Sequence, residues 1–299
     1  MAFSRALNGI RKAFLKERTP SMVVEERLFM EYTKGMVAVN STHLYYEQVG
    51  TGYPLVLIHG FTLNTQMWED QFSVFAQHYR VIRYDMRGSG LSAMPAEEPF
   101  TEVEDLLALL DALGVSRAIV LGLSRGGSVA IDFALAHPER IYALVLVDPA
   151  LGGWHWSEDF SQSMRELEIT ARTQSVDMAR QRWLAHPLFL PVRERSELAK
   201  QLAKIVASYS GWLWLQASSE RDTDLPTPRP LEQISVPTLL IMGERDIDEF
   251  QAISDYIAHS IPHLTKLVLP GVGHMSNMEA PETFNEAVLD FLENFKHHQ

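Results

Sequence analysis

AIVLGLSRGG, residues 118–127, joins a short apolar run to a Gly-x-Ser-x-Gly motif, and this junction decides the fold. Its first four residues are all apolar, which predicts a strand covered on both faces. The motif then opens a predicted helix over residues 126–136. The turn between them is so sharp that side chains at Gly122 and Gly126 would clash. It therefore presents the Ser124 hydroxyl above the sheet edge at a helix N-terminus, where developing negative charge is favoured.

The strand pattern recurs on both sides of this motif. Further strands are predicted at Met36–Asn40, His43–Val49, Pro54–Ile58, Val81–Tyr84, Ala143–Val147, Pro237–Met242 and Lys266–Leu269. Apolar stripes at helical spacing occur between them, for example in residues 103–110 and 284–295. Strands that alternate with helices, and that lack polar alternation, predict an α/β fold with a mostly parallel, doubly wound sheet.

Residues 150–232 interrupt this rhythm. The stretch is helical in pattern, is broken by prolines and contains Trp154, Trp156, Trp183, Trp212 and Trp214. We expect an inserted helical cap here, between core segments 36–149 and 233–299. Most of these tryptophans are expected to pack the cap on the core, and one or two to line an apolar substrate pocket.

The first 35 residues are expected to form an extension that is separate from the core. Apolar residues recur at helical spacing from Phe3 to Phe14, with five basic residues between or just after them. The pattern predicts a short basic amphipathic helix, since a secretory signal would need a continuous apolar stretch. Packing on the body, or fraying, is the simpler expectation; a membrane-surface or targeting helix is the alternative.

The composition limits the function classes. A chain of 299 residues with 46% hydrophobic residues can bury a large core, and its formal net charge is −12. Such a charge argues against a nucleic-acid partner, and against strongly anionic substrates unless a local basic pocket overrides it. The absence of cysteine excludes disulfides, thiolate metal sites and thiol nucleophiles, and fits a cytoplasmic location. No apolar run is long enough to span a bilayer.

A serine hydroxyl needs a base to take its proton, and the chain has 11 histidines. His274 follows the last predicted strand in Pro-Gly-Val-Gly-His, so it lies at the same sheet edge as Ser124. His59 also follows a strand, but we interpret it as loop structure ahead of the oxyanion segment. His155 and His186 fall in the cap, and the remaining histidines fall in or beside ordinary elements or in the C-terminal tail. We therefore predict His274 as the base.

The base needs a carboxylate that fixes its tautomer and stabilises the imidazolium. Asp246 follows the strand at 237–242 through a Gly-Glu-Arg turn and is the predicted partner. Asp248, two residues on, and Asp148, just past the strand at 143–147, are rivals on the same edge. The chain order Ser, Asp, His is the one expected for this arrangement.

Acyl transfer develops an oxyanion, which requires hydrogen-bond donors that are already in place. The backbone N–H groups of Phe61, after the strand at 54–58, and of Arg125 are the predicted pair. The Arg125 side chain is expected to form a salt bridge, with an acidic substrate group as the alternative. Asp85–Gly90, a D-x-R-G-x-G stretch, lacks the lysine of a phosphate loop, so we expect a tight turn in which Asp85 binds backbone N–H groups.

Taken in order, these motifs resemble the α/β-hydrolase superfamily in its compact, capped, esterase-like branch. They are His59-Gly60-Phe61, Asp85–Gly90, Gly122–Gly127, Gly243-Glu244-Arg245-Asp246 and Gly273-His274. The resemblance covers about Met36–Phe295 and departs at Arg125, where an apolar residue is usual. It implies attack of the serine on a carbonyl, an acyl-enzyme that water releases, and no metal or organic cofactor. Haloalkane dehalogenases and epoxide hydrolases of this fold have aspartate at the position of Ser124, which disfavours them.

The sequence thus predicts a serine hydrolase for carboxylic esters of small molecules. Two alternatives stay open: a lactonase or carbon–carbon bond hydrolase with the same triad, and a receptor-like protein that keeps the fold for ligand binding. Fold does not dictate substrate, so the sequence does not choose between ester and lactone. The oligomeric state is equally open.

Overall fold

The computed structural model describes residues 32–95, 99–216 and 229–296. By its internal contacts the chain divides into Met1–Glu31 and Tyr32–Gln299, and all of the described residues lie in the second unit. The basic amphipathic helix predicted near the N-terminus lies outside the described residues. Within the described part of the chain, no helix is both long and apolar enough to cross a membrane.

Eight strands form one sheet in the order β1-β2-β4-β3-β5-β6-β7-β8. Their bounds are β1 Thr33–Val39, β2 Thr42–Val49, β3 Pro54–Ile58, β4 Arg80–Tyr84, β5 Ala118–Leu123, β6 Ile141–Val147, β7 Thr238–Gly243 and β8 Leu264–Leu269. Pairing is antiparallel from β1 to β2 and from β2 to β4, and parallel from β4 to β8. The predicted mostly parallel sheet is confirmed, although β1 begins three residues before the expected Met36.

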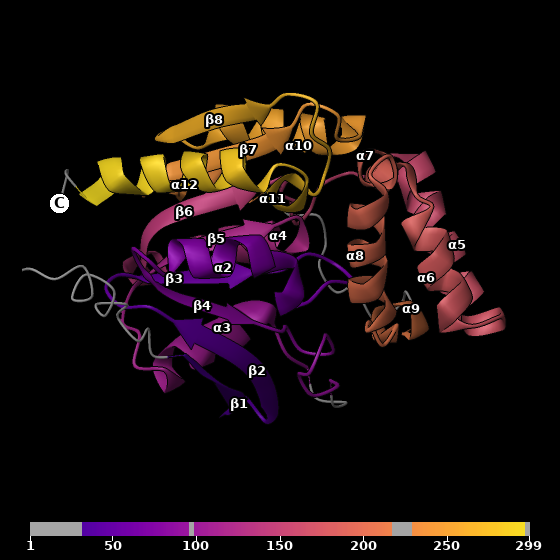
Figure 1. Cartoon of the computed structure of the whole chain (residues 1–299), viewed down its shortest axis with the longest axis horizontal. Helices are drawn as coiled ribbons and strands as arrows, with labels where there is room; N and C mark the ends of the chain where they lie inside the picture. The colour runs from indigo at the N-terminus through magenta and orange to yellow at the C-terminus, as the bar shows by residue number, and fades with distance from the viewer. Residues whose placement is uncertain (1–31, 96–98, 217–228, 297–299) are drawn as a thin grey trace, which may run out of the picture. The chain divides into compact units, whose positions relative to one another are not determined.

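Helices cover both faces of the sheet. The core helices are α2 Glu69–Phe75, α3 Glu102–Ala112, α4 Arg125–Ala136, α10 Asp248–Ser260, α11 Ser276–Glu279 and α12 Pro281–Lys296. Helix α2 packs against α12, and α3 packs against α4 (Figure 1). All residues of β5 and β7 are buried, because these strands have helices on both sides. This explains why their sequences are continuous apolar runs instead of alternating patterns.

Between β6 and β7 the chain forms the inserted helical cap. Its helices are α5 Glu158–Thr173, α6 Val176–Leu184, α7 Leu190–Arg193, α8 Ser196–Ala207 and α9 Trp212–Leu215. They gather beyond the carboxyl ends of the central strands (Figure 1). Hydrogen bonds tie the cap to core loops there: Trp183 Nε1 donates to Thr62 Oγ1 at 2.8 Å, and Asn64 Nδ2 donates to Ser208 Oγ at 2.8 Å. The cap therefore closes over the sheet edge at which the predicted site residues lie.

Candidate active site

Ser124 occupies the turn between β5 and α4, and its backbone has φ 55° and ψ −116°. A non-glycine residue in this region is strained, which is typical of functional sites. A Cβ at Gly122 would lie 2.1 Å from the Gly126 carbonyl oxygen, which is the clash expected at so sharp a turn. A Cβ at Gly126 would instead lie 2.3 Å from the carbonyl oxygen of Ile58. The second glycine is thus required by the neighbouring strand β3, a reason that the local sequence did not reveal.

His274 lies on the loop after β8 and is almost fully buried. Its Nδ1 lies 2.7 Å from Asp246 Oδ2, on the loop after β7. Asp246 Oδ1 accepts the Ile247 N–H at 2.8 Å, which fixes the carboxylate. A carboxylate on Nδ1 places the imidazole proton there and leaves Nε2 with a free lone pair, the tautomer that a general base needs.

The two rival acids make no such contact. Asp248 is exposed and begins helix α10. Asp148 is fully buried beside the pair, but its carboxylate contacts the Gly243 N–H and the Ser276 hydroxyl. Among the three candidates, the structure brings only Asp246 onto the imidazole.

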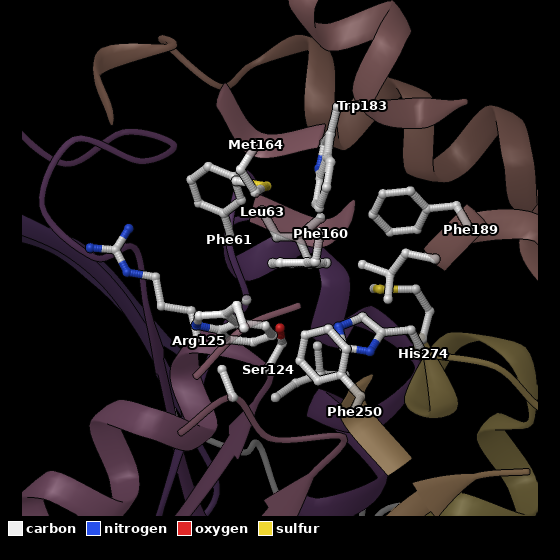
Figure 2. A pocket seen from close by; sticks show the side chains of 16 residues that line it. Phe61, Leu63, Ser124, Arg125, Phe160, Met164, Trp183, Phe189, Phe250 and His274 are labelled. Carbon is white, nitrogen blue, oxygen red and sulfur yellow. The ribbon is translucent and has the colours of Figure 1, made fainter. Parts of the chain in front are cut away.

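Ser124 and His274 line one pocket, and both side chains are directed into it (Figure 2). Within the part of the chain that the structure describes, the Ser124 hydroxyl forms no hydrogen bond with His274. Such contacts are commonly long without substrate and tighten when it binds. The structure therefore brings the serine and the histidine to one cavity, without a hydrogen bond between their side chains.

The two residues predicted to supply the oxyanion donors also belong to this cavity. The backbone N–H groups of Phe61 and Arg125 have no acceptor among the described residues, and both residues line the pocket. Thr62, next to Phe61, has φ 63° and receives the hydrogen bond from Trp183. The Phe61 ring makes edge contacts with Trp183, Tyr209 and Trp214 at centroid distances of 5.7, 5.7 and 6.0 Å. Cap aromatic residues thus hold the turn that carries one donor.

The Arg125 side chain forms an ion pair with Glu102 at the start of α3, so the predicted salt bridge is confirmed. Its guanidinium extends away from Ser124 (Figure 2). The predicted turn at Asp85 is confirmed as well. Asp85 accepts the N–H groups of Thr65 at 2.7 Å and Leu91 at 2.8 Å. Neither feature supplies a free positive charge to the pocket.

The pocket itself is almost wholly apolar and has about 730 Å³ of empty space, its open mouth included. Apart from Ser124, Arg125 and His274, it is lined by Gly60, Phe61, Leu63, Leu123, Ala150, Trp156, Phe160, Met164, Trp183, Leu188, Phe189, Phe250 and Met275. Two of the five cap tryptophans are in this set, as expected. Sequence reasoning missed the other cap residues and Phe250 of α10, because their helical apolar pattern is the same as that of ordinary core residues.

His59 is a structural histidine, in agreement with its interpretation as loop structure. Its Nε2 lies 2.9 Å from the Met86 N–H, which can only donate, so the ring proton lies on Nδ1, 2.8 Å from the Gly60 oxygen. Complete burial lowers the pKa of His59 to about 4, and the nearby Arg125 charge acts in the same direction. The neutral ring thereby holds the start of the turn that carries Phe61.

This burial predicts a loss of stability in mild acid. Below about pH 6.5 the unfolded chain protonates His59, whereas the folded chain does so only near pH 4. The unfolded state then binds more protons, so the free energy of unfolding falls across this window, by at most about 3 kcal/mol from this residue. Urea denaturation at pH 7 and pH 4.5 measures the loss. His59→Gln, which keeps an acceptor near Met86, should show a smaller loss; equal losses in both proteins would contradict the assignment.

Residues 53–281 match the alpha/beta hydrolase fold family, and the chain belongs to this family. It is 31% identical over 250 residues to 3-oxoadipate enol-lactonase 2 of Acinetobacter baylyi, a match covering 81% of this chain and 89% of that protein. It is 28% identical over 262 residues to the pimeloyl acyl-carrier-protein methyl ester esterase of Nitrosomonas europaea, covering 81% and 96%. The enol-lactonase structure from Burkholderia xenovorans LB400 superposes with a TM-score of 0.76 at 26% identity, covering 87% of this chain and all of that one.

Proposed function

We propose that this protein hydrolyses carboxylic esters of uncharged small molecules through an acyl-enzyme on Ser124. The observation that carries the proposal is that Ser124, with its strained backbone, and His274 share one pocket. The buried Asp246 holds this histidine, with Asp246 Oδ2 at 2.7 Å from His274 Nδ1. The triad roles of Ser124, His274 and Asp246 and the donor roles of the Phe61 and Arg125 N–H groups are part of this proposal.

In this proposal each group has one step. His274 Nε2 takes the Ser124 proton as the hydroxyl oxygen attacks the ester carbonyl, and the Phe61 and Arg125 N–H groups bind the oxyanion. The imidazolium, held by Asp246, then gives its proton to the leaving alcohol. Water, activated by the same imidazole, adds to the acyl-enzyme, and collapse of the second tetrahedral intermediate releases the acid and restores Ser124.

The pocket supports an uncharged, apolar substrate. Its lining side chains are aromatic or aliphatic apart from Ser124, Arg125 and His274, and the one guanidinium among them is paired with Glu102. A carboxylate on the substrate would lose its water shell and gain no counter-ion, which costs several kcal/mol. An ester with an apolar acyl chain instead gains free energy from every methylene that it buries.

A matched pair of esters tests this proposal. p-Nitrophenyl hexanoate and the p-nitrophenyl monoester of adipic acid have acyl chains of the same length and differ by a terminal carboxylate. We expect kcat/KM to favour the hexanoate by about 100-fold or more, which corresponds to about 2.7 kcal/mol. Steady-state kinetics at pH 7.5 give the ratio.

A ratio near one would contradict the substrate class while leaving ester hydrolysis intact. Adding hexanolactone to the panel tests the lactonase alternative. A clear preference for the lactone over the hexanoate would make a cyclic ester the proposed substrate. Binding of the hexanoate without turnover of any ester or lactone would overturn the enzymatic proposal and favour a receptor-like protein.

A further inference from the structure

Asp148 is a fully buried carboxyl group that the proposed reaction does not use. It follows β6 directly and has φ 41°, a left-handed conformation that few residues other than glycine, asparagine and aspartate adopt. Asp148, Asp246 and His274 each place a side-chain oxygen or nitrogen within 4.8 Å of the others. An acid in this position affects the proposed catalytic pair through its charge or through its hydrogen bonds.

The hydrogen bonds of Asp148 link the two loops that carry that pair. Its Oδ1 accepts the N–H of Gly243, the last residue of β7, at 2.8 Å; Asp246 follows three residues later. Its Oδ2 contacts the Ser276 hydroxyl, which also lies 3.2 Å from the carbonyl oxygen of Gly273, beside His274. One carboxyl group thus joins the end of β6 to the Asp246 loop and to the His274 loop.

The protons in this chain of contacts can be counted. The Ser276 hydroxyl has one proton but faces two oxygens, Asp148 Oδ2 and the Gly273 carbonyl. If Asp148 is ionised, one of these two contacts has no proton. If Asp148 carries a proton on Oδ2, it donates to Ser276, and Ser276 donates to Gly273. A neutral acid satisfies both contacts at once, as buried polar groups favour.

Electrostatics act in the same direction. Burial is the largest cause that raises the pKa of Asp148 well above its usual range, and the negative charge of Asp246 is the next. Among the described residues, Asp246 after β7 and His274 after β8 are the titratable groups grouped with it within 4.8 Å, and Glu279 of α11 binds the backbone on either side of His274. Glu279 binds the N–H groups of Gly273 at 2.9 Å and Met275 at 3.2 Å, and burial raises its pKa as well. Asp148 has no cation among its own hydrogen-bond partners that would stabilise an ionised form.

We propose that Asp148 is a neutral carboxylic acid at neutral pH, and that it positions the Asp246 and His274 loops through Gly243 and Ser276. A neutral Asp148 leaves Asp246 as the charged partner of the His274 imidazole. The catalytic consequence rests on the proposed function, whereas the protonation state does not depend on it.

Two variants separate a neutral positioning acid from a charged one. Asp148→Asn tolerates the positive φ and offers both an acceptor for Gly243 and an N–H donor for Ser276, so we expect kcat within about threefold of wild type. Asp148→Gly also tolerates the φ but removes both contacts, so we expect kcat to fall about 10- to 100-fold with KM little changed. The acid limb of kcat/KM in Asp148→Asn should coincide with that of wild type. Loss of activity in Asp148→Asn as large as in Asp148→Gly, or an acid limb displaced to lower pH, would overturn the proposal.

A second readout requires no activity. The unfolded chain loses the Asp148 proton above about pH 4, while the folded protein keeps it, so this residue makes wild type less stable as pH rises. Asp148→Asn lacks this contribution. We expect the melting temperature of Asp148→Asn relative to wild type to increase by several degrees from pH 5 to pH 8. A difference that stays constant over this range would show an ionised Asp148, whether or not the protein hydrolyses esters.

Discussion

Replacement of Ser124 by alanine is expected to lower kcat for p-nitrophenyl hexanoate by about 10⁴- to 10⁶-fold, because members of a triad act as a unit. The hydroxyl oxygen is the atom that forms the acyl bond, and the described part of the chain places no other hydroxyl against His274 in the pocket. Residual turnover should come from the oxyanion donors and from binding alone. Burst kinetics and mass spectrometry of quenched reactions should detect an added hexanoyl group in wild type and none in the variant.

The variant keeps the backbone strain at φ 55° and removes only one oxygen, so it should fold as wild type does. Equal melting temperatures and unchanged binding of the hexanoate product supply the control. A Ser124→Ala protein with at least one tenth of the wild-type kcat would show that the chemistry occurs without this hydroxyl, and the proposed function would have to be abandoned.

The second large effect is expected for Asp246→Asn, with a fall in kcat of about 10⁴-fold. The amide can donate to His274 Nδ1, which moves the ring proton to Nε2 and removes the lone pair that accepts the serine proton. The variant also loses the negative charge that stabilises the imidazolium. KM should change little, because the Asp246 side chain is buried behind the histidine and does not line the pocket. Stopped-flow measurement of the acylation step isolates this loss.

Asp248→Asn is the matched control, since it makes the same chemical change two residues away at an exposed position. It should stay within twofold of wild-type kcat, about the scale of a surface substitution. A large loss in Asp248→Asn together with a small loss in Asp246→Asn would move the acid role to the rival residue. A large loss in Asp148→Asn would instead point to a charged acid after β6.

Much of this architecture could be predicted because its signals are local. Each signal indicates the backbone conformation and the burial of residues only a few positions away. These signals are the apolar runs, the glycines around Ser124 and the position of His274 after the last strand. Parallel strands bring their carboxyl ends to one edge, which predicts that the serine, the acid and the base lie together. The strand bounds were less accurate, as β1 shows, because pairing with β2 extends the strand into residues that lack a strong apolar pattern.

The finer features of the site were left with rivals or were missed, because they depend on contacts between distant parts of the chain. The choice among Asp246, Asp248 and Asp148 is decided by which carboxylate reaches Nδ1, and loops after two different strands set that distance. The apolar lining depends on which faces of the cap helices turn inward, and their sequences do not distinguish a core contact from a pocket wall.

Sequence by itself therefore determined the fold, the serine on its turn and the chain order of the three candidate catalytic side chains, since periodicity and glycine sterics act over a few residues. Only the tertiary structure decided which acid holds the histidine, why Gly126 must lack a side chain, and that Asp148 bridges two loops. These outcomes are set by packing and by the low polarity of the buried interior, where a hydrogen bond or a charge acts between residues more than one hundred positions apart in the chain.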